Sequence, residues 1–323
     1  MRKKGKDSIY NAKILLFGEY TVIFESKALT IPYTYFTGKW SFMGSNKYTR
    51  MDKAVKSNRD LHRFLQYLES KSPIEKSCNL DLDRFREDLE KGLFFESNIP
   101  QGYGVGSSGA LVAAFYNDYC PEPLVAGDNE SLQELKEMFS LLESYFHGTS
   151  SGMDPLNCYI GEPLLFEGKK SAQIVEVPRQ TSNKDGAIFL INSGYPSATE
   201  PLVKLFLSKV DDEKFRKSVH EELIPLTNSS IDNIISGNLD RLFTDIGDIS
   251  EFQLFNFREM IPEKFMDLWK QGLDSGEFYL KLCGSGGGGF LLGFTRDYAI
   301  AEKLVAEAGI DIIPVYKNSF FRR

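Results

Sequence analysis

The apolar positions of the first hundred residues change from strand-like runs to helix-like spacing. Residues 11–17 form an apolar run that predicts a buried strand, and Lys13 lies inside it. Two more strands are predicted at 22–31 and 35–43, with turns at 25–27 and near 37–38. Apolar residues then recur at helical spacing in two segments, Leu61, Phe64, Leu65 and Leu68 followed by Leu82, Phe85 and Leu89. These stripes predict two amphipathic helices, each with one buried face.

The middle of the chain alternates a short strand, a glycine-rich turn and helices. Residues 93–97 are expected to form a strand that leads into the glycine-rich turn. A helix is expected from about Ser107, because serine is a good N-cap and apolar residues follow it. Residues 131–134, Ser-Leu-Gln-Glu, have the form of a capping box and predict the start of another helix.

The rest of the chain predicts a hairpin and then strands mixed with helices. The hairpin is expected from residues 156–160 and 164–166, joined at Gly161. The other elements expected are strands at 187–191, 278–283, 290–294 and 310–315, and helices within 201–275 and at 297–307. The order at this end of the chain is of the split βαβ type found in ferredoxin-like domains.

The length of the chain suggests two domains. A chain of 323 residues exceeds the usual size of a single domain. A polar stretch within 178–186 interrupts the apolar pattern, so we place the boundary there, with domains at 1–182 and 183–323. Hydrophobic content of 42% and charged content of 26% are ordinary for a soluble globular enzyme.

Charge and cysteine content narrow the function class. A net charge of −7 argues against a nucleic-acid-binding protein, which would show a basic face. The four cysteines show no C-x-x-C spacing, so neither a zinc site nor a disulfide framework is indicated. The basic start of the chain is followed by an apolar run too short for a signal peptide or a membrane span. We therefore expect a cytoplasmic protein that binds neither nucleic acid nor membrane.

A glycine-rich segment, Pro100-Gln-Gly-Tyr-Gly-Val-Gly-Ser-Ser-Gly109, carries the clearest chemistry. Glycine at every second position permits positive φ, so amide N–H groups can converge on an anion, and the helix that follows adds its dipole. No second strand with an acidic end follows, which excludes a dinucleotide fingerprint, and no Gly-Lys-Ser or Gly-Lys-Thr occurs, which excludes a Walker loop. The segment predicts a phosphate site, and a glycine-serine turn without a ligand is the alternative.

Three motifs together resemble the GHMP kinases, the superfamily of galactokinase, homoserine kinase, mevalonate kinase and phosphomevalonate kinase. Residues 100–108 resemble the family's phosphate-binding motif, 12–20 its first motif and 281–289 its third. Among subfamilies, residues 147–154 most resemble the mevalonate kinases. The resemblance implies a two-domain α+β fold, with a ribosomal-protein-S5-like N-terminal α/β domain, a ferredoxin-like C-terminal domain and an active site in the cleft between them.

The resemblance implies catalytic and metal-binding roles for four residues. Lys13 matches the lysine that faces the reacting hydroxyl and the transferred phosphoryl group, and Asp154 matches the catalytic carboxylate. Glu143, eleven residues before Asp154, matches a Mg²⁺ ligand, and Ser108 would bind the same ion. The residues alone leave alternatives: an edge-strand lysine, a surface glutamate and an Asp-Pro turn. His147 is interpreted as a structural residue at a helix end rather than a ligand.

Two further sets of residues complete the implied site, which would use ATP and Mg²⁺. The cofactor-binding residues are Pro100, Gly102, Gly104, Gly106, Ser107 and Ser108. The substrate-binding residues are Glu19, Tyr20, Thr199, Gly284 and Ser285.

The implied activity is transfer of the γ-phosphoryl group of ATP to a substrate hydroxyl, with mevalonate as the first choice. Tyr20 stands where mevalonate kinases usually have a histidine that helps to hold mevalonate, so phosphomevalonate or another small alcohol is an alternative. A diphosphomevalonate decarboxylase is disfavoured, because such enzymes generally lack the first motif that this sequence carries. A non-catalytic sensor is disfavoured because it would need neither metal ligands nor a base. The partners expected are ATP and the small alcohol, and a homodimer is left open.

Overall fold

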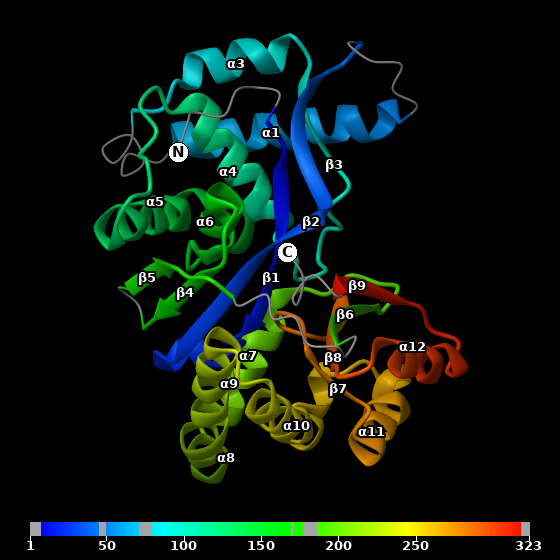
Figure 1. Cartoon of the computed structure of the whole chain (residues 1–323). Helices are drawn as coiled ribbons and strands as arrows, with labels where there is room; N and C mark the ends of the chain where they lie inside the picture. Colours follow the sequence, from blue (N-terminus) through cyan, green and yellow to red (C-terminus); the bar gives the residue numbers. More distant parts are fainter. Residues whose placement is uncertain (1–7, 45–49, 71–78, 169–170, 178–185, 318–323) are drawn as a thin grey trace. The chain divides into compact units, whose positions relative to one another are not determined.

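The computed structural model describes residues 8–44, 50–70, 79–168, 171–177 and 186–317. The chain divides into two compact units, each built from several segments (Figure 1). The first unit holds residues 1–13, 32–100 and 106–162, and the second holds residues 14–31, 101–105 and 163–323. The domain boundary predicted at residues 182 and 183 lies outside the described residues.

A five-stranded sheet includes the two N-terminal strands, β1 (Tyr10–Phe17) and β2 (Lys27–Phe42). Its order is β1-β2-β4-β5, and β3 (Leu93–Ser97) also pairs with β2, antiparallel from Gly38 opposite Ser97 to Phe42 opposite Leu93. The turn predicted at 37–38 is therefore wrong. Gly38 pairs with Ser97 inside the strand, and its lack of a Cβ leaves room for the ring of Phe95.

The start of the second predicted strand is also corrected. Residues Thr21–Phe24 form a short 3-10 helix, η1, and Glu25 at φ 62° ends it in the left-handed region. The strand then begins at Lys27. A strand was predicted here because 22–24 are apolar, but a short apolar run does not by itself distinguish strand from helix.

The first unit contains the helices α1 (Met51–Glu69), α3 (Leu82–Glu90), α4 (Ser107–Tyr119), α5 (Asn129–His147) and α6 (Met153–Ile160). The predicted stripe of α1, from Leu61 to Leu68, is buried, as are Phe85 and Leu89 of α3. Helix α4 is buried on almost every side and packs against both α5 and α6. These three helices carry most of the candidate site of this unit.

Two predicted elements of this unit are corrected by the structure. Helix α5 begins before Ser131, because Asp128 is the N-cap and its carboxylate accepts the N–H of Ser131, whose hydroxyl accepts the N–H of Asp128 in return. The predicted strand at 156–160 is wrong, because these residues belong to α6. Pro155 lies in the first turn of α6, where its missing N–H is tolerated, and Gly161 ends the helix in the left-handed region.

The second unit contains a hairpin and a four-stranded sheet. Strands β4 (Leu164–Glu167) and β5 (Ser171–Ile174) pair antiparallel, and β4 also pairs with residues 27–30 of β2. The four-stranded sheet has the order β7-β8-β6-β9, and all three of its strand pairs are antiparallel. Its strands are β6 (Ala187–Asn192), β7 (Phe278–Leu282), β8 (Phe290–Thr295) and β9 (Ile312–Lys317).

Helices separate the strands of this second sheet. Helix α12 (Tyr298–Glu307) connects β8 to β9, as the split βαβ pattern predicts. Between β6 and β7 lie α7 (Thr199–Val210), α8 (Glu213–Ser218), η2 (Val219–Leu223), α9 (Ile224–Ser236), α10 (Leu239–Asn256), η3 (Arg258–Met260), η4 (Glu263–Phe265) and α11 (Met266–Ser275).

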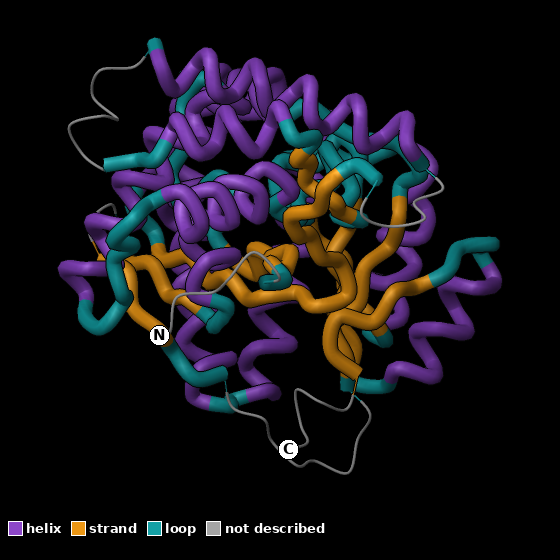
Figure 2. The backbone as a smooth tube through the Cα atoms, turned by 90° about the horizontal axis from the view of Figure 1, so that it is seen from above, coloured by secondary structure: helices purple, strands orange, loops and turns teal. Residues whose placement is uncertain are grey.

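Helix and strand both run through the described chain, as Figure 2 shows, which agrees with the predicted α+β class. None of the helices in the described ranges is long and apolar enough to cross a membrane. Cys120, Cys158 and Cys283 are buried, whereas Cys78 lies outside the described residues.

Candidate active site

Lys13 and Asp154 form an ion pair in the first unit. The Lys13 ammonium lies 2.9 Å from Asp154 Oδ1, with side chains that are 4% and 36% exposed. Lys13 is on β1, and Asp154 is in the first turn of α6, where a helix N-terminus favours negative charge. Asp154 and Pro155 therefore start a helix rather than form an isolated turn, and Lys13 has a nearby anion that accounts for its burial.

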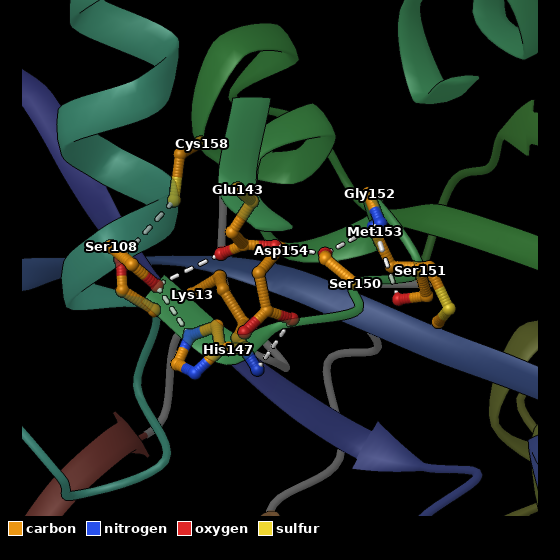
Figure 3. A network of polar contacts seen from close by, with 11 residues as sticks. Lys13, Ser108, Glu143, His147, Ser150, Ser151, Gly152, Met153, Asp154 and Cys158 are labelled. Carbon is orange, nitrogen blue, oxygen red and sulfur yellow. Dashed lines mark hydrogen bonds and ion pairs between the residues drawn. The ribbon is translucent and has the colours of Figure 1, made fainter. Parts of the chain in front are cut away.

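Ser108 and Glu143 lie together beside this pair (Figure 3). The Ser108 hydroxyl donates to Glu143 Oε1 at 2.9 Å, although the two residues are on different helices, α4 and α5. Glu143 is 3% exposed, so the alternative of a surface glutamate is excluded. Burial, and then the charge of Asp154, raise the pKa of Glu143 to about 7, while hydrogen bonds from Ser150 and Ser108 act in the opposite direction.

Two neighbours of this pair were not predicted as site residues. His147 Nε2 lies 3.1 Å from Ser108 Oγ, and the Ser150 hydroxyl donates to Glu143 Oε2 at 2.5 Å. Figure 3 shows both side chains turned toward the pair. A signal for His147 was available in the sequence, because residues four apart on a helix share a face and His147 follows Glu143 by four. No such periodicity identifies Ser150, which lies in a loop.

The end of the glycine-rich segment in this unit forms the start of α4. Gly106, at φ 78°, is the N-cap, and Ser107 and Ser108 are the first two helical residues. The N–H groups of a first helical turn have no partners within the helix, so they can bind an anion. The predicted N-cap, Ser107, is one residue too late, because only a residue without Cβ adopts this left-handed conformation readily.

Gly106 also makes room for Lys13. A Cβ at Gly106 would lie 2.8 Å from Lys13 Cγ. Gly106→Ala should therefore lower kcat by about tenfold or more, because the new Cβ displaces the lysine. The strain of alanine in the left-handed region should also lower the free energy of unfolding by about 1–2 kcal/mol. The matched control is Gly161→Ala, whose φ of 74° gives similar strain but whose Cβ would contact nothing within 4 Å.

Melting temperature and kcat measured on both variants separate these effects. Similar losses of stability with a selective loss of turnover in Gly106→Ala are expected. Equal turnover in the two variants would contradict the steric role of Gly106.

Gly109 sets the distance between α4 and the turn that carries Asp154. A Cβ at Gly109 would lie 2.8 Å from the Asp154 carbonyl carbon and 2.9 Å from the Pro155 nitrogen. The absence of a Cβ at Gly109 therefore lets the backbone at Asp154 and Pro155 lie against α4.

The predicted substrate-binding residues gather in the second unit. Tyr20 donates its phenol hydrogen to the Ser285 carbonyl oxygen at 2.6 Å, and the Ser285 hydroxyl lies 3.4 Å from Thr199 Oγ1. Tyr20 is a non-glycine residue at φ 65°, and its ring packs on Phe206 with 4.6 Å between ring centroids. Burial raises the pKa of the Tyr20 phenol well above its ordinary value.

Glu19 makes a buried ion pair with Lys281, a residue that was not predicted. The Lys281 ammonium lies 2.5 Å from Glu19 Oε1, and the two side chains are 1% and 3% exposed. The same ammonium donates to the Leu282 carbonyl oxygen and lies 5.7 Å from the centre of the Phe17 ring. The Glu19 carboxylate is therefore held by the protein itself.

The remaining predicted residues belong to the glycine-rich segment and to the third motif. In the second unit, the Gly102 carbonyl accepts the Ser197 N–H at 2.9 Å, and a Cβ at Gly104 would lie 2.6 Å from the Cys283 carbonyl oxygen, next to Gly284. In the first unit, Pro100 is half-buried and ends the segment that follows β3. The second unit thus brings together residues 14–20 of the first motif, residues 101–105 and the third motif.

The oxygen donors of the first unit fit a Mg²⁺ ion. Mg²⁺ is usually held by one or two carboxylates together with phosphate oxygens and waters. Ser108 and Glu143 supply a hydroxyl and a carboxylate within hydrogen-bond distance of each other, next to the start of α4. A buried carboxylate whose pKa is raised gains from a neighbouring cation, so the chemistry of this donor set suits the ion.

Comparison of the sequence with known proteins finds kinases. The family model described as the GHMP kinases N terminal domain matches residues 64–162. A mevalonate kinase of Pyrococcus horikoshii is 24% identical over 340 residues, which cover 94% of this chain and 92% of the relative.

Two solved structures share the fold. The structure of L. major mevalonate kinase in complex with R-mevalonate has a TM-score of 0.59 at 16% identity, covering 93% of this chain and 90% of that one. The Streptococcus pneumoniae phosphomevalonate kinase in complex with phosphomevalonate and AMPPNP has a TM-score of 0.60 at 13% identity, covering 96% and 98%. The family model over residues 64–162, the relative and the shared fold agree with the resemblance to the GHMP kinases, and they indicate a kinase, that is, a phosphotransferase.

Proposed function

We propose that this chain is an ATP-dependent, Mg²⁺-requiring mevalonate kinase. The observation that carries the proposal is the Lys13–Asp154 ion pair at 2.9 Å in the same unit as the Ser108–Glu143 pair. Phosphoryl transfer needs positioning and charge neutralisation more than covalent chemistry from the protein, and these four side chains supply both. The similarity to mevalonate kinases over most of the chain supports mevalonate as the substrate.

Asp154 and Lys13 act on the reacting hydroxyl in this proposal. Asp154 accepts the proton of the substrate hydroxyl, or orients it, as the hydroxyl oxygen bonds to the γ-phosphorus. The bond from that phosphorus to the bridging oxygen of ADP breaks, and ADP leaves with the electron pair. Lys13 balances the charge on the transferred phosphoryl group.

The ATP phosphates are held by backbone amides and by the metal pair. The N–H groups at the start of α4, including those of Ser107 and Ser108, donate to the phosphates. Mg²⁺ supplies charge neutralisation on the phosphate oxygens, and Ser108 and Glu143 are the residues that hold it.

One observation departs from the usual mevalonate site and supports keeping a second candidate, phosphorylation of phosphomevalonate or another small alcohol. A carbonyl oxygen only accepts hydrogen bonds, so the Tyr20 hydroxyl uses its hydrogen on Ser285. While this bond holds, Tyr20 offers a substrate only lone pairs and cannot also donate a hydrogen bond to it. The fold shared with a phosphomevalonate kinase is compatible with this candidate.

The cysteines show no spacing typical of a disulfide framework, which suits a reducing compartment, so we place the enzyme in the cytoplasm.

A substrate panel separates the candidates. The protein is incubated with ATP and Mg²⁺ and with mevalonate, phosphomevalonate, homoserine or galactose, and ADP release and product mass are measured. The highest kcat/KM is expected for mevalonate. A higher value for phosphomevalonate would replace the first candidate by the second, and ADP release without any phosphorylated product would contradict both.

A further inference from the structure

Both carboxylate oxygens of Glu143 are already oriented by serine hydroxyls. Ser108 donates to Oε1 at 2.9 Å and Ser150 donates to Oε2 at 2.5 Å, while Glu143 is 3% exposed. A carboxylate oxygen has more than one lone pair, so each oxygen can accept a hydroxyl hydrogen and still bind a cation. The two serines thus fix the rotation of the carboxylate without using up its capacity as a ligand.

Ser150 is itself held from two sides. The Gly152 N–H donates to its hydroxyl oxygen at 3.0 Å, and the Ser140 hydroxyl donates to its carbonyl oxygen at 2.6 Å. Ser140 lies on α5, the helix that carries Glu143. The loop between α5 and α6 therefore presents the Ser150 hydroxyl to Glu143 in a set direction.

His147 holds the other member of the pair. The Ser108 hydroxyl has one hydrogen, and that hydrogen is directed to the Glu143 carboxylate. The contact of 3.1 Å with His147 Nε2 then requires the imidazole to donate and Ser108 to accept, which assigns the hydrogen to Nε2. Ser108 keeps one lone pair for a metal ion.

From these contacts we propose that Ser150 and His147 are positioning residues, which hold Glu143 and Ser108 in the conformation that binds the divalent cation. The inference rests on the proposed metal site, but neither residue takes part in phosphoryl transfer. Partners that orient metal ligands typically change metal affinity by about 10- to 100-fold when they are removed.

The test measures metal binding directly. Mn²⁺ is titrated by electron paramagnetic resonance into full-length protein saturated with a non-hydrolysable ATP analogue. Ser150→Ala and His147→Leu should each raise the apparent Kd for Mn²⁺ by about tenfold or more. Ser150→Thr keeps a hydroxyl and His147→Gln keeps a side-chain N–H, so both should bind Mn²⁺ within about threefold of wild type.

Two controls separate positioning from general damage to the fold. Ser144→Ala, next to Glu143, removes a hydroxyl that donates to the Ser140 carbonyl, and it should leave the Mn²⁺ affinity unchanged. The affinity of the ATP analogue, measured with a chelator present, should be the same in every variant. A structural role alone would move melting temperature and analogue affinity together with Mn²⁺ affinity.

The outcomes are distinguishable from failure of the proposed function. Wild-type Mn²⁺ affinity in both Ser150→Ala and His147→Leu overturns the inference. It is also overturned if Ser150→Thr binds Mn²⁺ as weakly as Ser150→Ala, or if His147→Gln binds it as weakly as His147→Leu. If Ser150→Ala does not fold, the pair His147→Leu and His147→Gln decides alone. Mn²⁺ binding that follows the expected pattern in a protein that phosphorylates none of the alcohols supports the inference and overturns only the proposed function.

Discussion

Asp154→Asn should lower kcat by on the order of 10²-fold or more, the size expected for a group that accepts or directs a proton in the transition state. Asparagine keeps the size of the side chain but lacks the charge that faces Lys13 at 2.9 Å. Lys13 is only 4% exposed at its side chain, so the change also weakens the balance of charge around it. Turnover and the affinity of an ATP analogue are measured on the same preparation, and the affinity is expected to stay near wild type.

The matched control for this change is Asp240→Asn. Asp240 also lies in the first turn of a helix and also forms an ion pair, with Arg296 at 2.6 Å, but its side chain is 90% exposed. This control should leave kcat within about twofold of wild type, because exposed ion pairs contribute little. An Asp154→Asn variant as active as the control would show that Asp154 is not the catalytic carboxylate.

Breaking the Glu19–Lys281 pair should have the largest effect on stability. Removing one member of a buried ion pair typically costs about 3–5 kcal/mol, because the other charge stays buried with a poorer partner. Both side chains are at most 3% exposed, so Glu19→Gln should lower the denaturant midpoint clearly. The double variant Glu19→Gln with Lys281→Met should be less destabilised than the sum of the two single variants, because no buried charge remains.

An exposed pair provides the control for this prediction. Glu200 and Lys204, four residues apart on α7, are in contact at 2.6 Å, with side chains 72% and 73% exposed. Lys204→Met should change the free energy of unfolding by no more than about 0.5 kcal/mol. Equal shifts in midpoint for Glu19→Gln and Lys204→Met would contradict the account of the buried pair.

The sequence was most informative about the candidate site, because short motifs carry it. The motifs that resemble the GHMP kinases predicted a site of Lys13, Ser108, Glu143 and Asp154, and in the structure these four residues lie within one unit. The stripe of α1 was predicted correctly, because a strongly periodic apolar pattern depends little on tertiary contacts. The short strand 93–97 was also predicted correctly.

The errors arose where tertiary contacts or caps decide between alternatives. A short apolar run at 156–160 suits strand or helix equally, and Gly152 and Pro155 at its start decided for a helix. Ser150 and Lys281 acquire their partners only through folding, since the loop meets α5 and Lys281 meets a residue 262 positions earlier. No local periodicity encodes such contacts.

Direct detection of the product is the most decisive test of the central claim, that this chain transfers the γ-phosphoryl group of ATP to a hydroxyl. Phosphorus NMR is recorded on the protein with ATP, Mg²⁺ and mevalonate. We predict a phosphomonoester resonance that grows together with that of ADP, and that is lost in Asp154→Asn. Formation of ADP with inorganic phosphate alone, or a phosphomonoester formed equally fast by Asp154→Asn, would contradict the account.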